Sequence, residues 1–213
     1  VAIAVVAHAI LGMAKNLAPD LKRKSLVLFA LVATLLIPTA FIQVGVILIA
    51  AVIGFLLYNG QTVTDHASIQ FPVSRRFAII CLLLFFGLLI ILPLLRENTN
   101  LNWIAMFDSF YRSGSLVFGG GHVVLPLLER EFVPTGWLSE EAFLAGYGAA
   151  QAVPGPLFTF AAYLGAVING WQGGLVATAA IFLPAFLLIL GTLPFWDALR
   201  RNPKIKGALM GVN

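Results

Sequence analysis

Nineteen consecutive residues, from Phe77 to Leu95, carry no charge. A run of this length can cross the ~30 Å hydrocarbon core of a membrane, and it must be a helix because lipid cannot satisfy free backbone groups. Ser25–Tyr58 and Gly173–Phe195 are similarly apolar. Only 10% of the chain is charged, against about 25% in a soluble domain. These features predict an all-α, polytopic integral membrane protein.

Proline and polar residues divide this apolar chain into segments. Pro38 interrupts Ser25–Tyr58, and we expect two unequal helices there because proline removes a helical hydrogen bond and obstructs the preceding turn. Residues 59–76 form the longest polar stretch and a candidate linker. In total we expect about five to seven transmembrane or re-entrant helices, two of them broken at glycine and proline motifs.

Lysine and arginine are concentrated in residues 22–24, 75–76 and 200–206. Such clusters mark the cytoplasmic ends of membrane helices, so the net charge of +4 does not indicate nucleic-acid binding. If all three clusters are cytoplasmic, residues 96–170 must begin and end on the outer side. Two interrupted or re-entrant helices within that segment would satisfy this condition.

The first break is predicted at "FGGGHVVLP", residues 118–126. Three adjacent glycines lack the four-residue spacing of small-residue helix packing, and broken helices at membrane depth mainly line cavities. A helix restarting at His122 would present free N–H groups and its positive dipole end, which suits an oxyanion. Helix packing is the alternative. His122 either binds an anion or relays a proton, or it satisfies a freed carbonyl.

The second break is predicted at "QAVPGP", where Pro154 and Pro156 flank Gly155. Polar groups beside an unwound point resemble the discontinuous helices of secondary transporters, although a simple proline kink is the alternative. Polar residues four positions apart flank this break on each side: Tyr147, Gln151, Thr159 and Tyr163.

Charged residues lie close to the first break. Arg112 precedes the glycines by about one and a half turns, and Asp108 lies four residues before it, so an intrahelical ion pair is expected. Because ionisable residues inside membranes are functional candidates, we expect Arg112 to attract an anion. Residues 127–142 are expected to form an exposed connection, with Glu129–Glu131 at the membrane surface.

The chain lacks the motifs of most enzymes. It has no phosphate-binding loop, no HExxH pair and no cluster with metal-ligand spacing, so no catalytic residue, metal or cofactor is expected. The single cysteine, Cys81, excludes an intrachain disulfide. An intramembrane hydrolase would need a nucleophile among Ser113 and Ser115 with His122 as its base, and nothing in the sequence marks one.

In combination, "FGGGHVVLPLLERE", "GWLSEEAFLAGYGAAQAVPGPLFTFAAYLG" and "GLVATAAIFLPAFLLI" resemble the chromate ion transporter family. The resemblance implies two homologous membrane halves, each with a glycine-rich and a Pro-Gly-Pro motif, and shorter members that work in pairs. Residues 1–58 would then be the closing helices of a first half, 59–76 a linker and 77–213 the second half.

The resemblance also implies a function. Members move chromate out of the bacterial cytoplasm across the inner membrane, driven by the proton gradient, and confer chromate resistance; sulfate is a close analogue. The implied partners are the oxyanion, the lipid bilayer and the missing first half, with a homodimer left open. A scaffold or assembly subunit is the alternative function. The expected substrate-binding residues are Gly119, Gly120, Gly121, His122, Arg112, Gln151, Pro154, Gly155 and Pro156.

Overall fold

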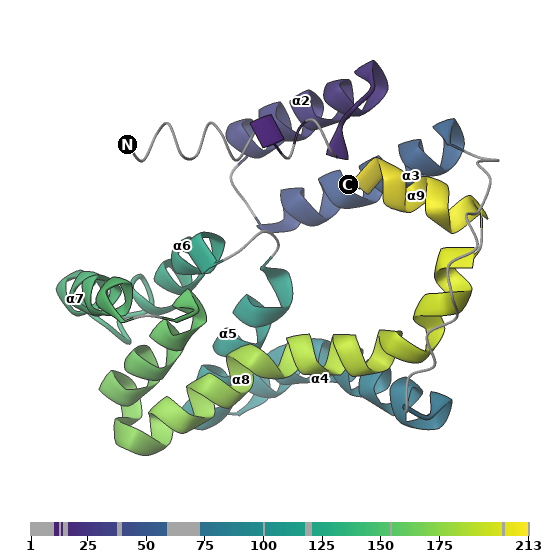
Figure 1. Cartoon of the computed structure of the whole chain (residues 1–213). Coiled ribbons are helices and arrows are strands. Elements are labelled where there is room, and N and C mark those ends of the chain that lie inside the picture. The colour runs from purple at the N-terminus through teal and green to yellow at the C-terminus, as the bar shows by residue number, and fades with distance from the viewer. Residues whose placement is uncertain are drawn as a thin grey trace. The chain divides into compact units, whose positions relative to one another are not determined.

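The secondary structure of the described residues consists of helices (Figure 1), which confirms the all-α prediction. Its contacts divide it into two compact units, one of Val1–Ile69 with Phe195–Asn213 and one of Gln70–Pro194. The computed structural model describes residues 11–12, 14, 17–37, 40–58, 73–99, 101–117, 121–153, 155–201 and 203–212.

In the first unit, α2 (Leu21–Leu36) and α3 (Ala40–Leu57) lie on either side of Pro38, as predicted. The carboxylate of Asp20 caps α2 by accepting a hydrogen bond from the backbone N–H of Arg23 at 2.8 Å. This bond holds the pKa of Asp20 below its usual value.

Helix α9 (Pro203–Val212) packs closely on α3. A methyl group on Gly54 would lie 2.6 Å from both the carbonyl oxygen of Gly207 and the Cα of Gly211. Gly207 and Gly211 are four residues apart, as are Ala50 and Gly54, which is the spacing of small-residue packing between membrane helices. These contacts group α9 with the N-terminal segment, and the division into two homologous halves stays a prediction.

In the second unit, α4 (Arg75–Asn98) contains the charge-free run. Ser74 caps its start by accepting a hydrogen bond from Phe77 N–H at 3.3 Å. Only 22% of its most apolar window is buried, so most of its large aliphatic and aromatic side chains face outward. Exposed apolar surface of this extent is unusual in a soluble monomer, whereas a lipid environment suits it.

The remaining helices of this unit are shorter, except for the last. They are α5 (Asn102–Leu116), α6 (Gly121–Phe132), α7 (Glu140–Ala152), the short 3₁₀ helix η1 (Leu157–Thr159) and α8 (Phe160–Arg201).

Helix α8 consists of two helices joined at Asn169 and Gly170. Gly170 has φ 62° and ψ −160°, a conformation that essentially only glycine adopts. A methyl group on Gly165 would overlap the backbone of Gly173, so the two helices turn back and touch without intervening side chains. The part after Gly170 still exceeds the ~20 residues needed to cross a membrane.

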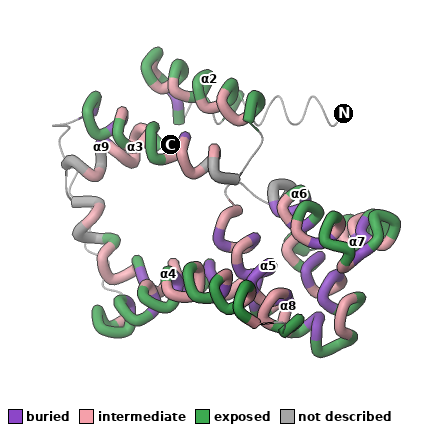
Figure 2. Tube along the Cα trace, turned by 180° about the vertical axis from the view of Figure 1, so that it is seen from behind, coloured by how far each residue is buried: buried purple, intermediate pink, exposed green. Residues whose placement is uncertain are grey.

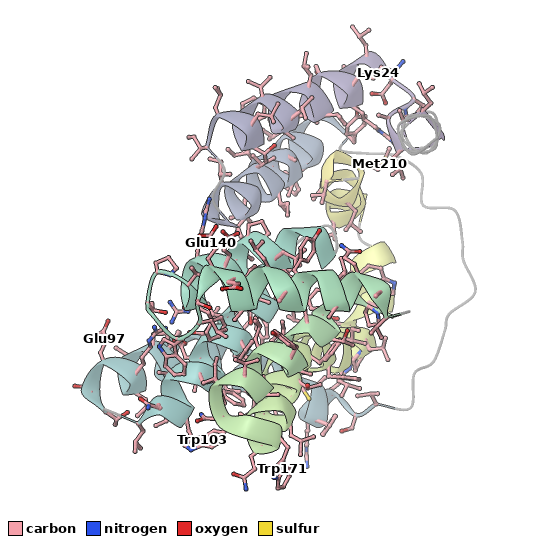
Figure 3. The ribbon with its side chains drawn as sticks, turned by 90° about the vertical axis from the view of Figure 1, so that its left-hand side faces the viewer. Lys24, Glu97, Trp103, Glu140, Trp171 and Met210 are labelled. Atoms are coloured by element: carbon pink, nitrogen blue, oxygen red, sulfur yellow. The ribbon has the colours of Figure 1, made fainter. Side chains whose placement is uncertain are left out.

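Two helical segments among the described residues, Arg75–Asn98 and Leu157–Trp196 with its break at Gly170, are long and apolar enough to cross a membrane. Trp103 and Trp171 are 42% and 73% exposed, and Figure 3 shows them on the same side of this unit. Exposed tryptophans are enriched where membrane meets water. These features identify a helical membrane protein.

The core of the second unit gathers α5, α6, α7 and α8, and Figure 2 shows buried residues concentrated in these helices. The expected exposed connection at 127–142 is wrong in part. Helix α6 continues through Phe132, and Leu128, Phe132 and Leu138 are buried. The reason is that the aromatic and leucine side chains of α6 pack against α5, with Phe132 on Phe110.

Candidate functional site

The chain reverses direction at the first predicted break. Helix α5 ends at Leu116 and α6 begins at Gly121. The rings of Phe110 and Phe132 have centroids 4.6 Å apart, although 22 residues of straight helix would separate them by about 33 Å. Helices α5 and α6 therefore form a folded-back pair, here called the first pair.

The second predicted break also reverses the chain. Helix α7 ends at Ala152, and η1 begins at Leu157. The Phe143 and Phe160 ring centroids lie 5.0 Å apart, and the Tyr163 hydroxyl donates a hydrogen bond to the Ala142 carbonyl at 3.1 Å. Residues 140–168 are here called the second pair, with "VPGP" at its turn.

The residues beside both breaks contact α8 at neighbouring positions. A methyl group on Gly114, near the end of α5, would overlap the backbone carbonyl of Ile181. The ring of Phe158, in η1, lies 5.8 Å from that of Phe182. Helix α6 also contacts η1 directly. The two breaks are thus gathered on one stretch of α8.

This stretch lies near the middle of the spanning segments. Ile181 is the eleventh of the 24 residues from 171 to 194. On α4, which also has 24 residues, the carbonyl of the eleventh, Phe85, accepts a hydrogen bond from the Tyr111 hydroxyl at 3.0 Å. Substrates of secondary transporters bind near the membrane midplane at discontinuous helices, and the contact of Gly114 with Ile181 lies near the middle of α8.

Proline and helix termini leave backbone groups unpaired near the breaks. The first N–H groups of α6, from Gly121 on, have no partner within their helix. Pro126 lacks an N–H, so the His122 carbonyl loses its helical donor, and Pro184 does the same for Ala180. At the second break, Pro156 precedes η1 without a side-chain capping bond. These N–H and carbonyl groups therefore lack the partners that an uninterrupted helix would supply.

A network of charges ties α5 to α4 and α6. The carboxylate of Asp108 pairs with Arg112, as predicted, and with Arg96, whose Nη1 lies 3.2 Å from Oδ2. The same nitrogen of Arg96 is 3.3 Å from Oε2 of Glu131, which also accepts a hydrogen bond from the Ser109 hydroxyl at 2.9 Å. The roles of Arg96 and Glu131 were not predicted, because pairing between separate helices has no local sequence signal.

The structure positions several of the predicted site residues. The hydroxyl of Tyr147 accepts a hydrogen bond from Nε2 of the exposed Gln151 at 3.0 Å. Gly155 has φ 158° and no atom within 4 Å of a Cβ built on it. Gly121 and His122 begin α6, while the side chain of His122 lies outside the described residues. Gly119, Gly120 and Pro154 also lie outside them.

The two serines considered for a hydrolase bond to their own helix. The hydroxyl of Ser113 donates to the Ser109 carbonyl, and that of Ser115 to the Tyr111 carbonyl, each at 2.7 Å. Both serines are buried. Their protons are engaged locally, as is common for serine in membrane helices.

Folded-back, broken helices gathered beside spanning helices define the architecture of a membrane transporter. The chromate transporter family matches residues 104–213, just over half of the 213 residues. The chain belongs to this family. The assignment agrees with the expectation of a transporter rather than an enzyme.

Individual relatives come from bacteria and an archaeon. An uncharacterized transporter of Methanocaldococcus jannaschii is 27% identical over 186 residues, 86% of this chain and 46% of its own length. A probable chromate transport protein of Synechococcus elongatus is 34% identical over 53% of this chain and 28% of its own. An uncharacterized transporter of Bacillus subtilis is 36% identical over 51% of this chain and 62% of its own.

The chain therefore spans less than two thirds of each of these relatives. The match to the Synechococcus elongatus relative has 113 residues and covers 28% of that protein. The match to the Bacillus subtilis relative has 111 residues and covers 62% of it, so the second relative is much shorter than the first. No solved structure matches this chain.

Proposed function

We propose that this chain forms part of a secondary transporter for a tetrahedral oxyanion, chromate in the first place and sulfate as its close analogue. The observation that carries the proposal is the gathering of two helix breaks on Ile181 and Phe182 of α8. Relatives from Synechococcus elongatus and Pseudomonas aeruginosa are named as a probable chromate transport protein and a chromate transport protein.

The chemistry of the breaks fits a dianion. Chromate and sulfate are best held by several N–H donors with few full positive charges, and the starts of helices present such donors. Arg112 adds one cation four residues before the end of α5. The proposed binding residues are those expected from the sequence: Gly119, Gly120, Gly121, His122, Arg112, Gln151, Pro154, Gly155 and Pro156.

The proposal also states the direction of chromate transport and the membrane in which it takes place. The protein moves chromate out of the cytoplasm across the inner membrane of a bacterium, and the proton gradient drives the movement. The rest of the binding site belongs to another membrane half, in the same polypeptide or in a second copy. Residues of that half complete the donor set around the oxyanion.

A scaffold or assembly subunit is the second candidate. The contact of Gly54 with Gly207 and Gly211 favours it, because glycines in this chain do serve close helix packing. That contact lies in the first unit and has the four-residue spacing that the glycine triplet lacks. The scaffold reading therefore explains α3 and α9 better than it explains the breaks.

Oxyanion flux tests the proposal directly. Everted membrane vesicles containing the full-length protein should accumulate labelled chromate, or sulfate, and collapsing the proton gradient should reduce the accumulation. Vesicles from cells without the protein provide the background. A correctly inserted protein that moves neither anion would refute the transporter and leave the scaffold.

A further inference from the structure

Asp108 lies between two arginines and is almost inaccessible. Its residue is 1% exposed, and its Oδ2 pairs with both Arg96 and Arg112. Arg96 in turn pairs with Glu131. Two guanidinium groups thus face two carboxylates, and the four charges cancel. Buried charges persist only when they are paired in this way.

Arg112 is partly exposed and has donors to spare for an anion. Its side chain is 32% exposed, whereas that of Asp108 is 2% exposed. Its Nε is buried without a hydrogen-bond partner among the described residues, so part of its five-donor guanidinium is unused. It lies four residues, about 6 Å along the helix axis, before the end of α5.

When Arg112 moves to an oxyanion, the charges of the remaining network no longer cancel. Asp108 and Glu131 would then share the single positive charge of Arg96, with one negative charge in excess. A carboxylate that loses its partner in a buried site tends to neutralise rather than remain charged. Glu131 keeps 28% of its side chain exposed and its bonds to Arg96 and Ser109, so the excess falls on Asp108.

We infer that Asp108 is the proton-binding residue of the transporter, taking up a proton when Arg112 leaves it for the bound oxyanion. The inference rests on the proposed function. In this step a proton from solution forms an O–H bond with the Asp108 carboxylate, and its ion pair with Arg112 breaks. No electron is transferred. When the anion departs, Arg112 returns and displaces the proton.

The groups around Asp108 leave it as the proton acceptor. Helix α4 contributes Arg96, α6 contributes Glu131, and α5 itself contributes Arg112 and Ser109. Helix α8 also packs on α5, but its residues 160–196 include no Asp, Glu, Lys, Arg or His. Among the carboxylates of this network, only Asp108 is paired directly with Arg112.

This arrangement fixes the sign of coupling. The proton and the anion bind together, so each dianion crosses with about one proton and carries a net charge of about −1. The electrical component of the proton gradient, a membrane potential that is negative inside, then drives efflux, while its smaller pH component opposes it. If the proton and the anion competed for the site, they would move in opposite directions across the membrane, and the coupling would have the opposite sign.

The test measures protons moved per anion, which does not depend on transport rate. The full-length protein is reconstituted in liposomes with the membrane potential clamped, at an alkaline pH where chromate is the fully deprotonated dianion. Inward chromate flux should acidify the lumen by about one proton per anion. Asp108→Asn should reduce this ratio to near zero, and Glu140→Gln, at an exposed residue of α7, should leave it unchanged.

Alkalinisation of the lumen by the wild-type protein, or an unchanged ratio in Asp108→Asn, would overturn the inference while leaving the transporter intact. Absence of any wild-type flux would instead refute the proposed function. If Asp108→Asn does not fold, proton uptake by the purified wild-type protein decides the question. When chromate is added in weak buffer, the protein should take up about one proton per binding site. Release of protons would contradict the inference.

Discussion

Replacing Gly114 by alanine places a methyl group against the backbone carbonyl of Ile181. Alanine in a helix is favoured over glycine by about 1 kcal/mol, but overpacking a close contact costs typically ~1–3 kcal/mol. The obstructing atom is backbone of a spanning helix, so it cannot rotate aside and the helices must separate. Subtracting the alanine gain from the overpacking cost leaves a net loss of up to about 2 kcal/mol in the free energy of unfolding.

Gly87→Ala provides the matched control. Gly87 lies within α4, and nothing lies within 4 Å of a Cβ built on it. The same chemical change there should leave stability unchanged or raise it by up to ~1 kcal/mol. The two substitutions are thus expected to have effects of opposite sign on stability, because only Gly114 contacts another backbone.

Thermal unfolding of the purified variants in detergent measures this difference, and chromate flux in vesicles measures its functional consequence. Gly114→Ala should unfold at a lower temperature than the wild-type protein and transport more slowly, since separating α5 from α8 moves the first break away from the second. If Gly114→Ala were as stable as Gly87→Ala and equally active, the close contact of α5 with α8 would be refuted.

Other substitutions test the site itself. Arg112→Gln should raise the half-saturating chromate concentration about tenfold or more, as expected for a lost charged hydrogen bond, and unaltered vesicle kinetics would contradict an anion-binding role. Gly120→Ala and Pro154→Ala should each lower chromate flux with normal membrane insertion, and unchanged flux in both would exclude the proposed site. Joint replacement of Ser113 and Ser115 by alanine should leave chromate flux within about twofold, because these hydroxyls donate to carbonyls of their own helix; abolished flux at normal expression would show a role beyond the helix.

Local sequence signals predicted the elements of this fold well. Absence of charge predicted α4, and proline and glycine predicted where α2, α5 and α7 end. The Asp108–Arg112 pair followed from their four-residue spacing. These features depend on neighbouring residues, and short-range physical rules describe them.

Contacts between distant segments could not be predicted in the same way. Ser109 and Glu131 meet only because the chain reverses between α5 and α6, and a broken helix that continued straight would have kept them apart. The contacts of Gly114 with Ile181 and of Phe158 with Phe182 depend likewise on the packing of whole helices. The sequence marked the breaks, whereas their convergence on α8 required the three-dimensional structure.

The position of the breaks near the middle of α8 has an electrical consequence. Moving one elementary charge across the whole membrane potential is worth about 2.3 kcal/mol per 100 mV. A dianion held beside Ile181 together with one proton would have carried a net charge of about −1 across about half of that potential, so its binding would change by about 1.2 kcal/mol per 100 mV, or roughly sevenfold in affinity. A site at this depth makes the occupancy of the transporter, and not only its speed, respond to voltage.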